Sequence, residues 1–440
     1  MDHAYLISFG CKVNRYEIES IKEILSQMDI GIVDTPAKAD LLIFNTCAVT
    51  QKSEQRARQY IRRFINQNPK AFIVVTGCMA QLHAQELATI DGIDLILGNL
   101  EKEDIQLFLK RFYKSGQKTG FPFIFVHRHL AEYQFHANEQ LLHHFTERTR
   151  AFLKIQDGCE AFCSYCIIPY LRGKYRSRSL DRVIEQIAIF QEQNFKEIVL
   201  TGIHIGKYGL EQDDYLLLPL LKRIIKETSI ARIRLTSIEP NEFSEELIDF
   251  IGYTPRICRH LHIPLQSGSN RILKVMNRHY TTSDYNRLIN MITNKIPEIG
   301  IGLDLIIGHP GEQESDFQDT YQFTKDLPPC YIHVFSYSDR PGTKSSLMQP
   351  KLSKETIQER TNQIIALGRY KRREFYNQFI DKKMEILVES QLIDGQWWNG
   401  LTSNYIRVHF RTSRPDVNQF VQTQLEYVDP QERVIGTLVP

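Results

Sequence analysis

Short apolar runs alternate with polar, helix-like stretches over the first hundred residues of the chain. The apolar runs cover 4–10, 40–47, 71–78 and 95–99, and amphipathic stretches such as 16–28 separate them. Apolar runs of this length that alternate with helical patterns are typical of βαβ units built on a parallel sheet. The pattern therefore predicts an N-terminal α/β domain over residues 1–120.

The same alternation resumes after a stretch in which it is lost. Residues 121–144 lack a regular pattern and hold five histidines in no common metal-ligand spacing, namely His127, His129, His136, His143 and His144. We interpret this stretch as a solvated linker, in preference to a metal site. Apolar runs then recur at 151–158, 197–203, 231–238, 260–266, 301–308 and 331–338. Six strands separated by helices predict a partial (βα)6 barrel over residues 145–375.

The last part of the chain changes pattern again. Short alternating runs at 384–390, 396–402, 404–410 and 433–439 follow one another without helices. Such runs predict a small antiparallel β-barrel over residues 376–440. The predicted fold class is thus α/β, with a parallel-sheet domain, a partial barrel and a small C-terminal β-barrel.

Composition agrees with a multi-domain globular protein. The chain has 440 residues, 42% hydrophobic and 24% charged, which argues against a disordered or fibrous chain. Because no apolar stretch approaches the roughly 18 residues needed to cross a bilayer, we expect a cytoplasmic protein with no membrane partner. In that compartment eight cysteines favour metal ligands or reactive thiols over disulfides.

Three cysteines stand close together directly after the first strand of the predicted barrel. Cys159, Cys163 and Cys166 follow a CxxxCxxC spacing, and Tyr165 precedes the last of them. An iron–sulfur cubane needs one ligand for each iron, so three thiolates leave one iron free to bind another molecule. A structural zinc site would need a fourth Cys or His, and the sequence offers none at a suitable spacing. We therefore expect these three cysteines to hold a catalytic [4Fe-4S] cluster.

Three further cysteines each follow a predicted strand of the N-terminal domain. Cys11, Cys47 and Cys78 come after the first, second and third long apolar runs, in the contexts FGC, NTC and TGC. The carboxyl ends of parallel strands meet at one edge of a sheet, so these thiols can converge on a second metal site. Taken alone, the grouping leaves coincidence open. Cys258 and Cys330 lack such partners and are expected to be ordinary buried thiols.

These motifs resemble those of the radical S-adenosylmethionine methylthiotransferase family. The similar segments are GCKVN, FNTCAVT, VTGCMAQ, the CxxxCxxC loop and HIPLQSGSNRILKVMNRHYT, which together span most of the chain. The resemblance implies an auxiliary [4Fe-4S] cluster in the N-terminal domain and a radical cluster with S-adenosylmethionine in the barrel. It also implies a C-terminal RNA-binding TRAM domain.

Small differences among the family's motifs point to a substrate. GCKVN and the segment 156–179 are similar to the branch that adds a methylthio group to C2 of N6-threonylcarbamoyladenosine at position 37, in the anticodon loop of tRNA. Alternatives are modification of isopentenyladenosine, whose branch usually has GCQMN, or of a ribosomal protein, whose branch usually has GCPKN. A non-catalytic iron–sulfur RNA-binding protein is a further alternative. We expect a monomer that receives electrons from a reductant such as flavodoxin or ferredoxin.

The resemblance also implies residues around the cofactor. Those we expect to contact S-adenosylmethionine or the substrate pocket, beside Tyr165, are Thr201, Gly202, Ser237, Glu239, Gln266 and Ser267. Each of these side chains could instead satisfy the local backbone. The segment DLIIGHPGE departs from the family's usual GFPGE form, because His309 replaces the aromatic residue.

RNA contacts must come from local basic patches, because 54 basic residues nearly cancel 52 acidic ones. Basic residues gather in four groups: Arg56, Arg58, Arg62 and Arg63; Arg172, Lys174, Arg176 and Arg178; Arg369, Lys371, Arg372 and Arg373; and Arg407, Arg411 and Arg414. We expect phosphate contacts from Arg56, Arg63, Arg172, Arg176, Arg178, Arg407 and Arg411. The third group is equally well explained as a solvated helix face. Near the last group, Trp397, Trp398, Tyr405 and Phe410 could stack on bases.

Overall fold

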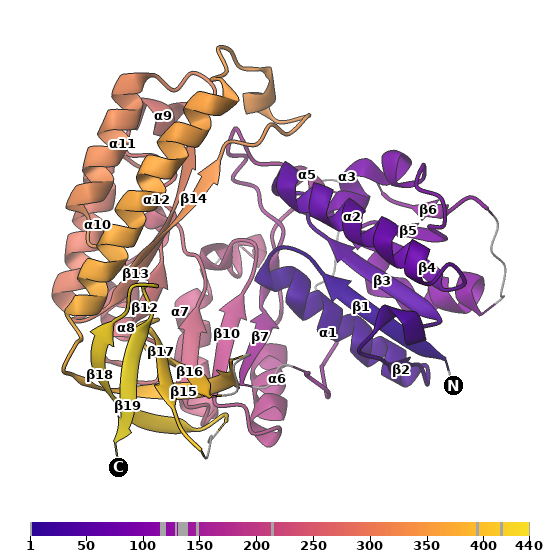
Figure 1. Cartoon of the computed structure of the whole chain (residues 1–440), viewed down its shortest axis with the longest axis horizontal. Helices are drawn as coiled ribbons and strands as arrows, with labels where there is room; N and C mark the ends of the chain where they lie inside the picture. The colour runs from indigo at the N-terminus through magenta and orange to yellow at the C-terminus, as the bar shows by residue number, and fades with distance from the viewer. Residues whose placement is uncertain are drawn as a thin grey trace.

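The computed structural model describes residues 2–114, 120–127, 130, 140–146, 149–212, 215–392, 396–413 and 417–439. His129, His136 and Arg414, which the sequence singled out, lie outside this set. Figure 1 shows three bodies along the chain: an indigo to purple α/β domain, a magenta to orange barrel and a small yellow barrel at the C-terminal end.

The N-terminal domain is a six-stranded parallel sheet with helices on both faces. Its strands lie in the order β2-β1-β3-β4-β5-β6. The elements are β1 (His3–Ser8), α1 (Lys12–Gln27), β2 (Gly31–Ile32), β3 (Leu41–Thr46), α2 (Gln51–Gln67), β4 (Phe72–Gly77), α3 (Cys78–Leu87), β5 (Leu95–Leu97), α4 (Ile105–Phe108) and β6 (Phe123–Phe125). The central strands β3 and β4 are buried on both faces, as expected for a sheet covered by helices.

This sheet extends beyond the boundary that the sequence predicted at residue 120. Strand β6 pairs in parallel with β5, so it belongs to the N-terminal sheet and not to a linker. Its phenylalanines pack against the helical segment before it, with ring centroids 4.8 Å apart for Phe108 and Phe125. The apolar run at 121–126 was too short to distinguish an edge strand from a loop.

The central domain is the predicted open barrel of six parallel strands. Its elements are β7 (Arg150–Lys154), α5 (Ile168–Arg172), α6 (Leu180–Glu192), β10 (Glu197–Thr201), α7 (Leu217–Glu227), β11 (Arg232–Leu235), α8 (Glu245–Tyr253), β12 (His260–His262), α9 (Asn270–Val275), α10 (Thr282–Lys295), β13 (Gly300–Ile307), α11 (Glu314–Asp326), β14 (Tyr331–Ser336) and α12 (Lys354–Asn377), with a short ribbon of β8 (Gln156–Asp157) and β9 (Arg176–Ser177). Bridges between β11 and β12 segments join two three-stranded sheets into one wall.

The apolar core of this domain lies between the strands and the outer helices. Alternate residues of β13, such as Leu303 and Leu305, belong to that core, whereas Asp304 between them is on the opposite side of the strand. Strand side chains alternate between two faces. The inner face of the barrel is therefore the polar one, and chemistry can take place there.

The C-terminal domain is a closed barrel of five strands in the order β15-β16-β17-β19-β18. Its strands are β15 (Lys383–Gln391), β16 (Trp397–Thr402), β17 (Arg407–Arg411), β18 (Phe420–Val428) and β19 (Val434–Val439). The sequence missed β18, in which the polar residue Thr423 takes a buried position. The barrel is not wholly antiparallel, since β17 and β19 pair in parallel. A closed barrel with an odd number of strands cannot alternate direction at every neighbour.

The C-terminal barrel docks on the amino ends of the central strands, at the lower end of the barrel in Figure 1. Arg234 of β11 donates hydrogen bonds to the carbonyl oxygens of Thr402 and Ser403 at 3.1 and 3.0 Å. Tyr405, in the turn between β16 and β17, stacks on His260 with ring centroids 4.2 Å apart. Tyr405 was expected to stack on RNA bases, but its ring packs against the barrel instead.

We predict that Tyr405→Ala weakens this docking. Loss of the stacked ring should lower the unfolding free energy of the C-terminal barrel by about 1–3 kcal/mol. Thermal unfolding followed by limited proteolysis at the domain junction measures the effect. Tyr427→Ala is the matched control, because Tyr427 is an exposed tyrosine of the same barrel. Equal behaviour of the two variants would contradict a docking role for Tyr405.

Candidate active site

Cys11, Cys47 and Cys78 meet at one edge of the N-terminal sheet. They follow β1, β3 and β4, which are parallel neighbours, so the strand ends bring the three thiols together. Gly10 has a φ of +95°, and a Cβ at this position would stand 2.6 Å from the sulfur of Cys47. The backbone before Cys11 therefore passes directly against Cys47 because residue 10 is glycine.

The amide of Asn14 holds these strand ends in place. Its Nδ2 donates to the carbonyl oxygens of Phe9 at 2.8 Å and Thr46 at 3.0 Å, which precede Cys11 and Cys47. Burial, together with the neighbouring Cys78, raises the pKa of the Cys47 thiol to about 12. A thiol with a pKa this high stays protonated at neutral pH unless a bound metal ion displaces the proton, and the set fits a thiolate-ligated metal group.

Cys159, Cys163 and Cys166 form a compact site beyond β8. The loop is fixed by backbone hydrogen bonds, from the Cys159 N–H to the Gly173 carbonyl and from the Cys166 N–H to the Cys163 carbonyl, both 2.9 Å. Burial raises the pKa of the Cys159 thiol to about 11. All eight cysteines of the chain are free thiols. Three free, converging thiols on one loop fit a cluster that keeps one iron open.

Two residues that the sequence analysis did not name contact these sulfurs. Arg278 Nη1 lies 3.3 Å from the sulfur of Cys163, and His204 Nδ1 lies 3.5 Å from that of Cys159. Arg278 also forms an ion pair with Glu239. Arg278 stands within the similar segment 262–281, but its distance of 115 residues from Cys163 hid the contact.

A cavity of about 210 Å³ is lined by residues from both cysteine sites. Val49 and Thr50, from the loop after Cys47, line it together with Tyr165 and Cys166 of the compact site. Gln266, at the end of the central wall, completes the part of the lining that the sequence predicted. The cavity therefore borders the compact site at Cys166 and the loop that follows Cys47.

The other residues expected near the cofactor lie at barrel strand ends with varied local roles. Thr201 ends β10 and Gly202 follows it, packed against the backbone of Gln156. Ser237 Oγ lies 2.6 Å from His262 Nδ1 on the barrel wall. Ser267 differs, because its hydroxyl lies 3.2 Å from that of Thr320 and accepts from the Ser269 N–H. Ser267 thus stabilises the turn into α9.

His309 still packs as an aromatic ring. It lies edge-on to Tyr165 and to Tyr337, with ring centroids 6.4 and 5.6 Å apart. Its Nε2 lies 2.7 Å from Ser345 Oγ, and burial lowers its pKa to about 4. A neutral imidazole therefore occupies the place that the family usually gives to an aromatic side chain.

The wall of the barrel carries a polar group that the sequence analysis did not predict. His262 and His333, from β12 and β14, place ring nitrogens 3.0 and 3.2 Å from the same carboxylate oxygen of Asp304 on β13. Although burial opposes it, hydrogen bonding to the two histidines holds the pKa of Asp304 well below its usual range. Asp304 also lines the cavity, so an ionised carboxylate faces it.

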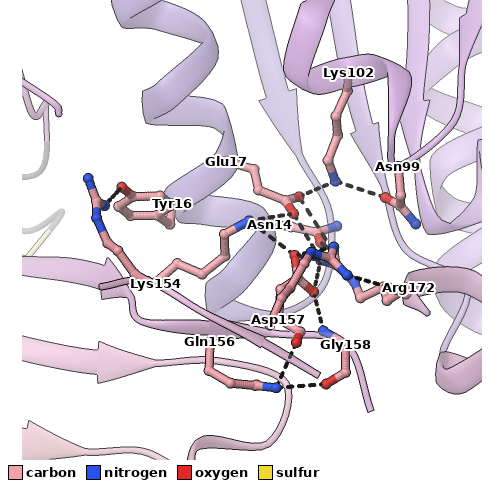
Figure 2. A network of polar contacts seen from close by, with 12 residues as sticks. Asn14, Tyr16, Glu17, Asn99, Lys102, Lys154, Gln156, Asp157, Gly158 and Arg172 are labelled. Atoms are coloured by element: carbon pink, nitrogen blue, oxygen red, sulfur yellow. Dashed lines mark hydrogen bonds and ion pairs between the residues drawn. The ribbon is translucent and has the colours of Figure 1, made fainter. Parts of the chain in front are cut away.

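A buried polar network joins the N-terminal domain to the barrel (Figure 2). Arg172 is 1% exposed, and its Nη1 lies 2.9 Å from Glu17 of α1 and 3.0 Å from Asp157 of β8. Its Nη2 donates to Asn14 Oδ1 at 3.0 Å. Lys154 adds a contact of 3.1 Å to Asp157. The network lies between the two cysteine sites, since Asn14 follows Cys11 and Asp157 precedes Cys159.

This network changes the interpretation of the second basic group. Arg172, Arg176 and Arg178 are all buried, and Arg176 pairs with Asp157 at 3.2 Å. Arg178 donates to the hydroxyl of Tyr16 at 2.6 Å. The prediction that these three arginines bind RNA phosphates is wrong for this structure, because all three side chains are buried and bond to other residues of the chain. Sequence alone could not distinguish a basic run from an interface.

The remaining basic residues of the prediction are exposed. Arg56 and Arg63 project from α2, the helix that follows Cys47. Arg407 is exposed but pairs with Glu389 at 2.7 Å. The Arg411 guanidinium lies over the ring of Trp397, 4.6 Å from its centroid. No helix within the described residues is both long and apolar enough to span a bilayer.

Comparisons with known proteins match this architecture. Residues 3–98 match the model of an uncharacterized protein family, UPF0004, and residues 153–324 match that of the radical SAM superfamily. The structure is similar to the radical S-adenosylmethionine methyltransferase TsrM from Kitasatospora setae, with a TM-score of 0.58, 15% identity and coverage of 79% of this chain and 77% of that one. This likeness concerns the fold alone. The chain is a radical SAM protein.

Proteins of similar sequence identify the family within the radical SAM superfamily. The chain is 38% identical to the threonylcarbamoyladenosine tRNA methylthiotransferase MtaB of Aquifex aeolicus, over 91% of this chain and 95% of that protein. It is 36% identical to the MtaB of Bacillus subtilis, over 95% and 92%. It is 31% identical to the tRNA-2-methylthio-N(6)-dimethylallyladenosine synthase of Acetivibrio thermocellus, over 96% and 88%. The chain belongs to the tRNA methylthiotransferase family.

We predict that Arg172→Met separates the two domains. The variant leaves Glu17 and Asp157 buried with less compensating charge, and breaking such a pair costs about 3–5 kcal/mol. The expected result is a lower midpoint of thermal unfolding for the cluster-free protein and faster proteolysis between α4 and β7.

The matched control is Arg223→Met, which removes an exposed arginine that pairs with Glu227 on the surface. Exposed ion pairs contribute little, so this variant should unfold like the parent. An Arg172 variant as stable as the control would contradict the role of the network.

Proposed function

We propose that this protein adds a methylthio group to C2 of N6-threonylcarbamoyladenosine at position 37 of tRNA. The observation that carries the proposal is the presence of two cysteine sites, one in each domain, near a cavity lined by Cys166 of one site and by Val49 and Thr50 after Cys47 of the other. The choice of substrate is supported by two relatives named threonylcarbamoyladenosine tRNA methylthiotransferase MtaB, which are 36–38% identical over nearly the whole chain. The enzyme uses S-adenosylmethionine and two [4Fe-4S] clusters.

In this proposal Cys159, Cys163 and Cys166 hold the radical cluster. When bound, this cluster supplies the electron that cleaves S-adenosylmethionine. Arg278 and His204 stabilise the negative charge of the thiolates, because a buried charge needs nearby donors. Tyr165 and Gln266 line the cavity and would fix the cofactor there, with Thr201, Gly202, Ser237 and Glu239 at the adjoining strand ends.

Cys11, Cys47 and Cys78 hold the auxiliary cluster, from which the sulfur is delivered. Val49 and Thr50 extend from this site to the cavity, so they would hold the adenine near both reacting groups. Apolar lining such as Ile167 and Ile306 excludes water, which protects a reactive radical. The division of labour thus follows the two domains.

RNA would approach over α2, which begins four residues after Cys47 and carries the exposed Arg56 and Arg63. Arg411, over Trp397, and Arg407 would contact more distant phosphates from the C-terminal barrel. The target base must leave its stack to enter the cavity. Extrusion from a duplex takes a few kcal/mol, and a loop nucleotide lowers that requirement.

The proposal also includes the electron donor and the oligomeric state. The electrons come from a small redox protein such as flavodoxin or ferredoxin, and the enzyme acts as a monomer in the cytoplasm. The second candidate substrate is isopentenyladenosine, which the 31% identity to a dimethylallyladenosine synthase favours.

We predict that the two cysteine sites fail differently. Cys163→Ala should abolish formation of 5′-deoxyadenosine from S-adenosylmethionine under anaerobic, reducing conditions. Cys47→Ala should retain a measurable part of that cleavage and lose all methylthio product, because the compact site holds the cluster that cleaves the cofactor and Cys47 belongs to the site that delivers the sulfur. Chromatography of 5′-deoxyadenosine and nucleosides reads out both.

Cys258→Ala is the control, since Cys258 is a buried thiol outside both sites. Equal loss of both activities in Cys163→Ala and Cys47→Ala would contradict separate cluster roles. A reconstituted parent protein that forms no 5′-deoxyadenosine would instead favour the non-catalytic RNA-binding alternative.

We predict that the double variant Arg56→Gln and Arg63→Gln binds tRNA several-fold more weakly. If each arginine neutralises one phosphate, the slope of log affinity against log salt should decrease by about 2. Filter binding across salt concentrations measures the slope. Arg287→Gln, an exposed arginine on α10, is the control. An unchanged slope in the double variant would remove α2 from the RNA interface.

A further inference from the structure

Asn99 is a buried amide beside the sulfur of Cys78. It lies two residues after β5, the neighbour of β4, and its side chain is 2% exposed. Its Nδ2 donates to the carbonyl oxygen of Leu171 at 2.8 Å and lies 3.7 Å from Cys78 Sγ. The Asn99 N–H group thus reaches both the sulfur and the segment that carries Arg172.

The carbonyl oxygen of the Asn99 amide faces the positively charged side chain of Lys102. Lys102 Nζ donates to Asn99 Oδ1 at 2.8 Å and lies 2.7 Å from Glu17 Oε2, as Figure 2 shows. The Lys102 side chain is 5% exposed. A cation on the carbonyl oxygen polarises the amide and makes its N–H a stronger donor, because hydrogen bonds in a chain reinforce one another. Lys102, Asn99 and Cys78 therefore form a relay.

The charges around this relay leave a positive surplus on the side of the sulfurs. Lys102, Lys154 and Arg172 form ion pairs with two carboxylates, Glu17 and Asp157. Arg176 and Glu103 add one charge of each sign to the group around Lys154 and Asp157. Both Lys102 and Arg172 act electrostatically on Cys78. The surplus complements thiolates.

We propose that Asn99 and Lys102 are positioning residues that tune the reduction potential of the auxiliary cluster through Cys78. The inference rests on the proposed function, in which Cys78 is a ligand of that cluster. Reduction adds one electron to a cluster already bound by thiolates, and a buried cation and an N–H···S hydrogen bond stabilise the added charge. The relay therefore raises the potential and eases electron uptake at the sulfur-delivering site.

The test uses the full chain with Cys159, Cys163 and Cys166 all changed to Ala, so that only the auxiliary cluster gives a signal after reconstitution with iron and sulfide. Asn99→Asp replaces the N–H donor with a carboxylate of nearly the same shape and so adds a negative charge, and Lys102→Met removes the positive charge and keeps the apolar stem. Each cluster is titrated with dithionite, which supplies the electron, and followed by electron paramagnetic resonance.

We expect Asn99→Asp to lower the ratio of reduced to oxidised cluster about tenfold at the parent's midpoint, which equals about 59 mV for one electron. Lys102→Met should shift the ratio in the same direction by a smaller factor. The control is Asn68→Asp, another amide of the same domain, which donates to the carbonyls of Pro36 and Ala39. Its potential should match the parent's.

The possible failures are distinguishable. Intact clusters with unchanged potentials in both variants would overturn the tuning role and leave the proposed function untouched. Loss of the cluster from both variants, but not from Asn68→Asp, would overturn it in favour of a purely structural role. A parent that assembles no cluster without the compact cysteines would contradict the proposed function itself.

Discussion

One buried guanidinium determines how the two halves of the active site face each other. Arg172 lies at the end of α5, shortly after the compact cysteines. Its guanidinium contacts Glu17 and Asn14 of the N-terminal domain, and it also pairs with Asp157, close to Cys159. A guanidinium buried to this extent is stable only when carboxylates and hydrogen-bond acceptors surround it, so its geometry is strict. The separation of the two sulfur sites follows from this interaction.

The remaining features of the site depend on strand ends. The N-terminal sheet delivers three cysteines to one edge because β1, β3 and β4 are parallel neighbours, and the barrel delivers its loop and polar wall in the same way. Ligand sites at the carboxyl ends of parallel strands are a general property of such folds. Here two such edges face one cavity, which suits a reaction that needs two metal sites.

Much of this arrangement could be predicted from the sequence, and the reasons for the failures are physical. The compact cysteine motif and all six barrel strands are local patterns, so periodicity and spacing predict them. Cys11, Cys47 and Cys78 were grouped by their places after predicted strands and by the family resemblance. Strand β18 was missed because the polar residue Thr423 takes a buried position and interrupts the apolar alternation, and β6 because it is only three residues long. Arg172 was assigned to RNA because burial depends on contacts with Glu17, 155 residues away. Asn99 and Lys102 carried no local signal.

The most direct test of the account is mass spectrometry of nucleosides from purified tRNA that carries N6-threonylcarbamoyladenosine, after anaerobic incubation with the reconstituted protein, reductant and S-adenosylmethionine. We expect conversion of that nucleoside to its 2-methylthio derivative, with isopentenyladenosine in a parallel tRNA left unchanged. An unmodified threonylcarbamoyladenosine in the presence of active S-adenosylmethionine cleavage would contradict it.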